Sequence, residues 1–253
     1  MAGVSGVRYD AIGRDYARTR RADPRLAERI ECALGDARSV LNVGAGAGSY
    51  EPRDRYVVAV EPSDVMAAQR PRELAPAIRC SAGAIPLRDD SVDGAMAVLS
   101  IHHWDDEQQA GVLEMRRIAR DAVVIVTYDP LASGEMWLMR DYLPEVADLD
   151  RRIFPAPQLI VAWLGGNATV DVLPIPSDTP DWMLGSFWAH PERVLDPAAR
   201  AATSGLARMA PATVDRVVAA VADDLESGAW DERYGDLREL EEYDVGLRLI
   251  VAT

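Results

Sequence analysis

The sequence predicts an α/β fold in which a parallel sheet is covered by helices on both faces. Short apolar runs at residues 39–43, 56–61, 78–81, 92–100 and 122–128 indicate five strands, and helical patterns lie between several of them. The runs are continuous rather than alternating, which is typical of strands that are buried on both faces. The chain has 253 residues, of which 49% are hydrophobic, so it can bury a large core.

Cap signals and helical spacing predict the helices around this sheet. Asp23 followed by Pro24 places an N-cap before a proline at the first helical position, so a helix is expected to begin there. Ser63 is the expected N-cap of a helix that reaches Leu74. Prolines and large apolar side chains crowd residues 130–196, which indicates short helices and irregular segments. The other expected elements are helices at 105–120, 197–208 and 211–226 and strands at 169–173 and 246–252.

Composition argues against several classes of function. The net charge of -14 disfavours a surface that grips nucleic acid or an anionic membrane, because both need clustered positive charge. All 27 basic residues are arginines, which excludes Schiff-base and P-loop lysine chemistry. Cys32 and Cys80 belong to no CxxC pair, so we expect no structural zinc or redox motif. Neither a secretory leader nor an apolar run of ~18 residues is evident, and we expect a cytoplasmic setting.

A glycine-rich loop follows the first predicted strand. Gly44, Gly46 and Gly48 alternate with alanines, and glycines let the backbone pass close to a ligand. Glu61 ends the second predicted strand, where a carboxylate can accept both hydroxyls of a ribose. Because ligands bind outside the carboxyl ends of parallel strands, the loop and Glu61 are expected to share one crevice. The alternative interpretation is a tight turn beside a surface glutamate.

The spacing of these glycines differs from the dinucleotide fingerprint. GxGxxG would require glycine at position 49, where the chain has Ser49, and no pyrophosphate anchor is evident. A nucleoside ligand without phosphates therefore fits the loop better. An NAD-dependent oxidoreductase is the rival interpretation, and a nicotinamide-binding assay would test it.

Four longer segments contain motifs that occur together in one known protein family. They are YDAIGRDYARTRRADPR (9–25), VLNVGAGAGSYEP (40–52), VVAVEPSDVMAAQR (57–70) and CSAGAIPLRDDSVDGAMAVLSIHHW (80–104). Together they resemble the class I S-adenosylmethionine-dependent methyltransferases, in particular the small-molecule group related to ubiquinone and menaquinone biosynthesis. In chain order they resemble the segment that lids the cofactor, the cofactor loop, the ribose-binding motif, and the motifs beside the adenine and the methionine tail. The resemblance runs from about Tyr9 to Ala252.

This resemblance implies S-adenosylmethionine as the cofactor. It also implies a Rossmann-like fold with a seven-stranded, mostly parallel sheet, helices on both faces and a helical lid or cap. The expected organisation is one methyltransferase domain over residues 1–253. Within it the resemblance places lid helices at about 1–35, a cofactor-binding core at 36–129, a substrate cap insertion at 130–200, and C-terminal helices with the last strand at 201–253.

The resemblance assigns the cofactor contacts position by position. The glycine loop would touch the cofactor through its backbone, and the carboxylate after the second strand would hold the ribose. Near the ribose and the loop, the implied contacts are Gly44, Ala45 and Gly46 in the loop and Glu61 on the ribose. Near the adenine and the methionine moiety they are Pro62 and Met66 packed on the adenine, Ser81 and Ala82 at the adenine edge, and Leu99 and Ser100 beside the methionine moiety. The lid would contribute Tyr9, Tyr16 and Arg20, and Arg20 is a candidate partner of the cofactor carboxylate.

Two positions depart from the family's pattern. The family usually has an acidic residue where Asn42 stands, and often aspartate where Ser81 stands. Both residues can hydrogen-bond, but neither brings a charge. These departures motivate an alternative function, in which a non-methylating homologue keeps the fold and uses the pocket for another reaction or for ligand binding.

Catalysis by such a protein needs few dedicated groups. Methyl transfer from a sulfonium is an in-line displacement, which depends on positioning and on exclusion of water. His102 and His103 follow the fourth predicted strand, where an imidazole can act as a base or orient the acceptor. Either could instead make only local hydrogen bonds, and His190 is a weaker candidate. Adjacent histidine side chains diverge, so we expect no metal site.

Large apolar side chains downstream predict a lid over an apolar pocket. The acceptor is therefore expected to be a small molecule, apolar or aromatic, methylated on oxygen, nitrogen or carbon. The alternative is that these side chains form the core of the added helices. They are Trp137, Met139, Tyr142, Phe154, Trp163, Trp182, Phe187 and Trp188, and Tyr128 and Asp129 lie where a substrate could reach.

Overall fold

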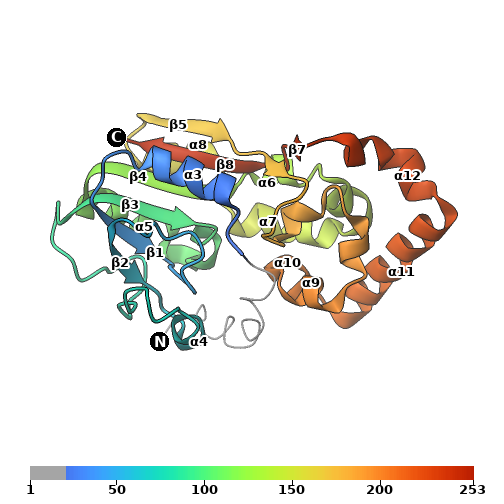
Figure 1. Cartoon of the computed structure of the whole chain (residues 1–253), viewed down its shortest axis with the longest axis horizontal. Helices are drawn as coiled ribbons and strands as arrows, with labels where there is room; N and C mark the ends of the chain where they lie inside the picture. Colours follow the sequence, from blue (N-terminus) through green and yellow to red (C-terminus); the bar gives the residue numbers. More distant parts are fainter. Residues whose placement is uncertain (1–20) are drawn as a thin grey trace.

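The computed structural model describes residues 21–253, and its centre is a sheet with helices on both faces (Figure 1). The strands of this sheet span Ser39–Val43 (β1), Tyr56–Val60 (β2), Val92–Val98 (β3), Ala119–Tyr128 (β4), Ala168–Val172 (β5) and Leu247–Ala252 (β8). Their order is β2-β1-β3-β4-β8-β5. β1 to β4 are parallel, whereas β8 runs antiparallel to β4 and β5. The predicted α/β fold with a mostly parallel sheet is confirmed.

The sheet has six strands within the described residues rather than the expected seven. The segment expected as a strand at 78–81 makes a single parallel bridge, between Ile78 and Val60. Two backbone hydrogen bonds, Ile78 N to Ala59 O and Glu61 N to Ile78 O, complete that contact. The next residue, Arg79, turns its guanidinium to the Pro62 carbonyl and the Asp64 carboxylate, and the pairing ends there.

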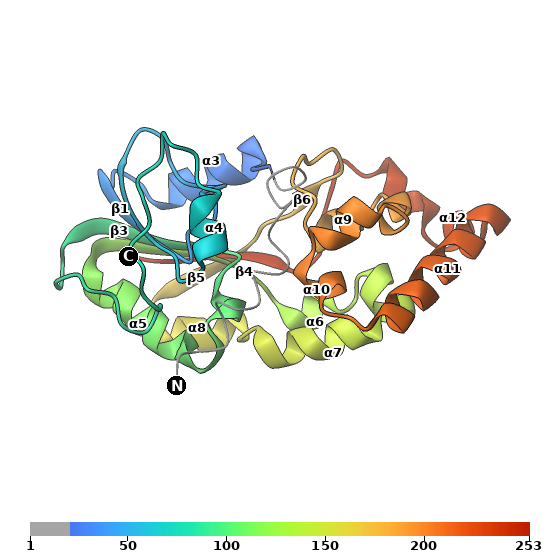
Figure 2. The same ribbon diagram turned by 90° about the horizontal axis from the view of Figure 1, so that it is seen from below.

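Both faces of the sheet are buried, as the continuous apolar runs predicted. In β4, Val124 joins the cluster that contains Ile30, whereas Ile125 joins the cluster that contains Met115 and Ile160. Figure 2 shows the helices of these clusters on opposite sides of the sheet. The covering helices are Pro24–Ala33 (α3) on one side and Gln108–Ile118 (α5) and Pro157–Trp163 (α8) on the other.

A helical half lies beside the sheet, at the carboxyl ends of the parallel strands (Figure 1). Its helices are Pro130–Ser133 (α6), Pro144–Ile153 (α7), Pro197–Ala201 (α9), Ser204–Ala207 (α10), Pro211–Ser227 (α11) and Ala229–Tyr234 (α12), with a π-helical turn at Leu138–Tyr142. Short 3-10 turns span Leu184–Phe187, Pro191–Val194 and Gly235–Glu239, and the two-stranded pair of Ile175–Pro176 (β6) and Glu242–Tyr243 (β7) closes this half. Within the expected cap insertion, α8 covers one face of the sheet and β5 is one of its strands. The division of the chain into lid, core, cap and C-terminal part stays a prediction.

Two predicted helices are shorter than expected. The helix capped by Ser63 spans only Asp64–Ala68 (α4), because Pro71 disfavours a helical conformation at the residue before it. The expected helix at 197–208 is interrupted between α9 and α10, where Thr203 has an extended backbone. The early end of α4 and the break between α9 and α10 both come from local backbone preferences, which the spacing of apolar residues does not reveal.

The large aromatic side chains of the added segments form a core of their own. Trp188 and Phe187 are fully buried, and the Trp137 indole donates to the Trp188 carbonyl at 2.9 Å. Trp230 packs edge-on against Trp137 with ring centroids 5.4 Å apart. A helical half that stands beside the sheet has to bury an apolar core itself, and these side chains supply it. In the described part of the chain, no helix combines the length and apolar character that would let it cross a bilayer.

Candidate functional site

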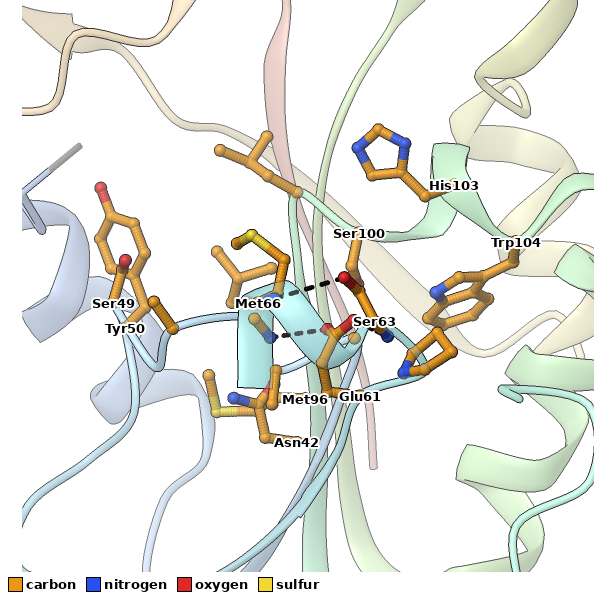
Figure 3. Close-up of a pocket in the computed structure, with 17 residues that line it drawn as sticks. Asn42, Ser49, Tyr50, Glu61, Ser63, Met66, Met96, Ser100, His103 and Trp104 are labelled. Carbon is orange, nitrogen blue, oxygen red and sulfur yellow. Dashed lines mark hydrogen bonds between the residues drawn. The ribbon is translucent and has the colours of Figure 1, made fainter. Parts of the chain in front are cut away.

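A cavity lies at the carboxyl ends of β1 and β3. β1 pairs with β2 on one side and with β3 on the other, so the strand order reverses at this point. Open parallel sheets bind their ligands at such a switch point. The lining residues come from three segments, 42–50, 61–66 and 96–104, and Figure 3 shows them converging on one space.

The glycine loop is held against the ends of two strands. The N–H groups of Gly44 and Ala45 both donate to the Val60 carbonyl at 2.9 Å. Gly44 has φ +70°, and a Cβ atom there would lie 2.5 Å from the Ser100 Cβ. Ser100 in turn donates its hydroxyl to the Val43 carbonyl at 2.8 Å. Only glycine fits at position 44, and its small size brings the loop backbone to the cavity surface.

Glu61 joins this loop to the segment after β2. One carboxylate oxygen accepts from the Gly46 N–H and the other from the Ser63 N–H, each at 2.8 Å. The residue is 6% exposed. Burial raises the pKa of the Glu61 carboxyl, against the two backbone hydrogen bonds and the charges of Arg79 and Arg70. Each carboxylate oxygen still has a lone pair available, so the group can accept two hydroxyls from the cavity.

A buried ion pair lies under the same loop. The Arg70 guanidinium contacts both carboxylate oxygens of Glu51 at 2.8 Å, and the two side chains are 4% and 0% exposed. Asn42 donates its amide N–H to Glu51 at 3.0 Å. This bond fixes which end of the Asn42 amide faces Glu51 and leaves its oxygen as an acceptor, and Asn42 also lines the cavity. A carboxylate is thus present next to Asn42, but it comes from Glu51 and is neutralised by Arg70.

The lining of the cavity also includes a strained residue and three residues with aromatic rings. Leu99 has φ +52°, a conformation that costs a side-chain-bearing residue energy and that concentrates at functional sites. The Tyr50 hydroxyl donates to Asp181 at 2.8 Å, which links the glycine loop to the helical half. Trp104 and His103 line the opposite side from Tyr50 in Figure 3.

The two adjacent histidines have different surroundings, although their ring centroids lie only 3.7 Å apart. The expectation that their side chains diverge is therefore wrong. His103 lines the cavity, whereas His102 is 7% exposed and stacks on Phe154 with ring centroids 4.2 Å apart. Of the eight large side chains expected as a lid, Phe154 stacks on His102 of the histidine pair, and none of the eight lines the cavity. The Tyr128 ring meets Phe154 edge-on at 5.8 Å.

The two weaker candidates have local partners. Asp129 caps α6 by accepting from the Leu131 N–H at 3.0 Å. The Nε2 atom of His190 lies 2.7 Å from the Ser177 carbonyl. Neither of them lines the cavity.

Most of the cofactor contacts implied by the resemblance do line the cavity: Gly44, Ala45, Gly46, Glu61, Pro62, Met66, Leu99 and Ser100. Ser81 and Ala82 are not among the lining residues, and Ala82 is 5% exposed and packs in the core with Trp104. Tyr9, Tyr16 and Arg20 lie outside the described residues.

Sequence reasoning missed several lining residues: Ala47, Ser49, Tyr50, Ser63, Met96, Val98 and Trp104. Strand periodicity would have linked two of them, because Met96 and Val98 are two positions apart in β3 and so point to the same face of the sheet. The others adjoin residues that the motifs had already indicated.

Comparison with known proteins identifies the same segments. Residues 41–127 match the family described as a methyltransferase domain. A solved structure from Anabaena variabilis, named as a methyltransferase from an antibiotic biosynthesis pathway, is 30% identical, covers 93% of this chain and 99% of its own, and has a TM-score of 0.85. No curated protein matches the sequence significantly.

Two more distant solved structures share the fold. The SAM-dependent methyltransferase of Thermotoga maritima is 21% identical, with 70% of this chain and 87% of its own covered and a TM-score of 0.52. A phosphoethanolamine N-methyltransferase of Haemonchus contortus, solved in complex with S-adenosyl-L-methionine, is 14% identical. It covers 99% of this chain and 59% of its own, with a TM-score of 0.59.

Proposed function

Because the chain belongs to the class I S-adenosylmethionine-dependent methyltransferases, we propose that it methylates oxygen, nitrogen or carbon of a small, largely apolar acceptor. The observation that carries this proposal is the convergence of the glycine loop, Glu61 and His103 on one cavity at the switch point. The finer assignments of residues to cofactor and acceptor, which follow, are part of the proposal.

The residues of the cavity fit S-adenosylmethionine. We assign Glu61 to the ribose hydroxyls, because its carboxylate is buried and already oriented by two backbone donors. We assign the Asn42 amide oxygen to the ammonium of the methionine moiety, since an uncharged acceptor can still receive its N–H groups. Met66 is 4% exposed and supplies an apolar contact for the adenine. When bound, the cofactor supplies an electrophilic methyl group on a sulfonium.

The acceptor is proposed to enter from the side of the helical half. Leu99 and His103 line the cavity, and Arg208 of the helical half reaches His103 at 3.3 Å. Apolar contacts from Leu99, Val98 and Trp104 would hold an acceptor without a large charge. The protein then acts by fixing the acceptor atom in line and by excluding water, and no protein nucleophile is required.

The Anabaena protein supports the class of acceptor. It is named for an antibiotic biosynthesis pathway, and it aligns over 93% of this chain. A specialised metabolite with an apolar or aromatic skeleton is consistent with the apolar contacts that Leu99, Val98 and Trp104 offer in the cavity. We therefore propose an acceptor of that chemical kind.

A label-transfer experiment tests the proposal. The purified protein is incubated with S-adenosylmethionine labelled in its methyl group and with an extract of the source organism. The labelled products are then partitioned between water and an organic solvent. We expect label in molecules extractable into organic solvent, and much less with Glu61→Ala. Label in precipitated protein or nucleic acid, or in very polar compounds, would contradict the proposed acceptor class. A protein that binds the cofactor but transfers no label would favour the non-methylating alternative.

A further inference from the structure

His103 is contacted across a long sequence separation by an arginine of the helical half. Arg208 is the C-cap residue that follows α10, and its Nη2 atom lies 3.3 Å from Nδ1 of His103, in the short turn Ile101–His103 after β3. The two residues are 105 positions apart. The contact therefore depends on how the helical half packs against the sheet.

The chemistry of this contact determines what His103 can do. A guanidinium group only donates hydrogen bonds, so Nδ1 of His103 has to be the acceptor. In a neutral imidazole whose Nδ1 accepts, the ring proton is on Nε2. A proton on Nδ1 would instead point at the positive charge of Arg208. His103, which lines the cavity, then carries an N–H donor on Nε2 and has no lone pair there for a general base.

Neighbouring groups hold this arrangement in place. The His102 ring lies between Phe154 and His103, with centroid distances of 4.2 and 3.7 Å, and this limits rotation of the His103 ring. Asp150 of α7 is 9% exposed; burial raises the pKa of its carboxyl, and the charge of Arg208 acts against that rise. Asp150 and Arg208 are therefore close enough to interact within the helical half.

We propose that Arg208 is a positioning residue that fixes His103 as a hydrogen-bond donor, through Nε2–H, toward the acceptor. This inference rests on the proposed function and deepens it. The acceptor would carry a lone pair, on a carbonyl, phenolate or ether oxygen or on an imine-type nitrogen, close to the methylated atom. Any proton that leaves the methylated atom goes to a group other than Nε2 of His103.

The ring nitrogens of His103 can be observed directly. The chain has 3 histidines, so a protein labelled with nitrogen-15 in histidine gives three ring systems, and His103→Gln identifies the one of interest. At a pH about two units above the ordinary imidazole pKa of about 6.5, we expect a protonated Nε2 and an unprotonated Nδ1 with the shift of a hydrogen-bonded nitrogen. A His103 ring protonated on Nδ1 would overturn the proposal.

Variants of Arg208 test whether its guanidinium is what keeps Nδ1 of His103 a hydrogen-bond acceptor. Arg208→Met should abolish the hydrogen-bonded shift of Nδ1, and Arg208→Lys, which keeps a donor, should retain part of it. Arg216→Met is the matched control, because Arg216 bonds Tyr142 and Glu145 instead of a histidine. An unchanged Nδ1 shift in a folded Arg208→Met protein would refute the role of Arg208.

The same samples separate this inference from the proposed function. Affinity for S-adenosylhomocysteine should change less than about twofold in Arg208→Met, because Arg208 does not line the cavity. A much larger loss would show a general structural role and contradict the assignment. The nitrogen shifts are read without an acceptor, so a failed label-transfer experiment would leave them valid.

Discussion

The Cβ position of Gly44 lies 2.5 Å from the Cβ of Ser100, closer than two such atoms can approach. The glycine loop therefore touches the segment that follows β3 through a residue that has no side chain. This contact fixes the loop beside Leu99 and Ser100, and it makes the shape of the cavity depend on one glycine.

Replacing Gly44 should damage both stability and cofactor binding. Gly44→Ala adds a steric clash and an unfavourable positive φ, so we expect a loss of about 1–3 kcal/mol in unfolding free energy and at least a tenfold weaker S-adenosylhomocysteine affinity. Gly228→Ala is the control, since Gly228 has φ +81° but nothing within 4 Å of its Cβ position. Urea denaturation and calorimetry measure both effects. Equal affinity losses in the two variants would contradict the account.

Cofactor affinity should depend on pH through Glu61. The pKa of this carboxyl is raised by burial, so it takes up a proton at a higher pH than an exposed glutamate does. The protonated form loses acceptor capacity, and affinity for S-adenosylhomocysteine should fall as the pH is lowered through that raised pKa. Glu61→Gln should bind about tenfold more weakly, about 1.4 kcal/mol, with little pH dependence over the same range. An acid-side decline that persists unchanged in Glu61→Gln would show that another group is responsible.

Breaking the ion pair beneath the loop should be costly. Glu51→Gln leaves the buried Arg70 guanidinium without its counter-charge, and we expect a loss of about 3–5 kcal/mol in unfolding free energy. Asp148→Asn removes an exposed partner of Arg151, and here we expect a loss of about 1 kcal/mol or less in unfolding free energy. Urea denaturation of both variants gives the comparison. Similar losses would mean that burial of the Glu51 pair has no special effect.

Asp150 should make the protein less stable as the pH rises. Burial raises the pKa of its carboxyl to about 7, so the folded chain holds this proton more tightly than the unfolded chain does. Stability from this group is complete below the ordinary carboxyl pKa, declines as the pH approaches 7, and is lost above it. Asp150→Asn should therefore gain roughly 2–4 kcal/mol over the wild type at pH ~8 and almost nothing at pH ~4. A difference that stays constant between these pH values would contradict the raised pKa.

The sequence was a good guide wherever local patterns decide the structure. Continuous apolar runs indicated strands buried on both faces, and Val124 and Ile125 do face two separate clusters. Asp23 and Ser63 cap their helices as expected, through hydrogen bonds to the N–H groups of Arg25 and Met66. The glycine loop and Glu61 meet because strand order brings their ends together.

Contacts between segments far apart in the chain could not be predicted from the sequence. Tyr50 reaches Asp181 across 131 positions, and Arg208 reaches His103 across 105. No periodicity encodes such pairs, since they arise only when the helical half packs on the sheet. The aromatic residues show the same limit, because a composition suited to a lid is equally suited to the core that they form.

Binding of S-adenosylhomocysteine by calorimetry tests the central claim most directly. The account predicts micromolar affinity for the wild type, at least a tenfold loss in Glu61→Ala, and no change in Glu192→Ala, whose carboxylate pairs with Arg238 in the helical half. A folded wild type that binds neither S-adenosylmethionine nor S-adenosylhomocysteine, or a Glu61→Ala variant that binds as well as the wild type, would contradict it.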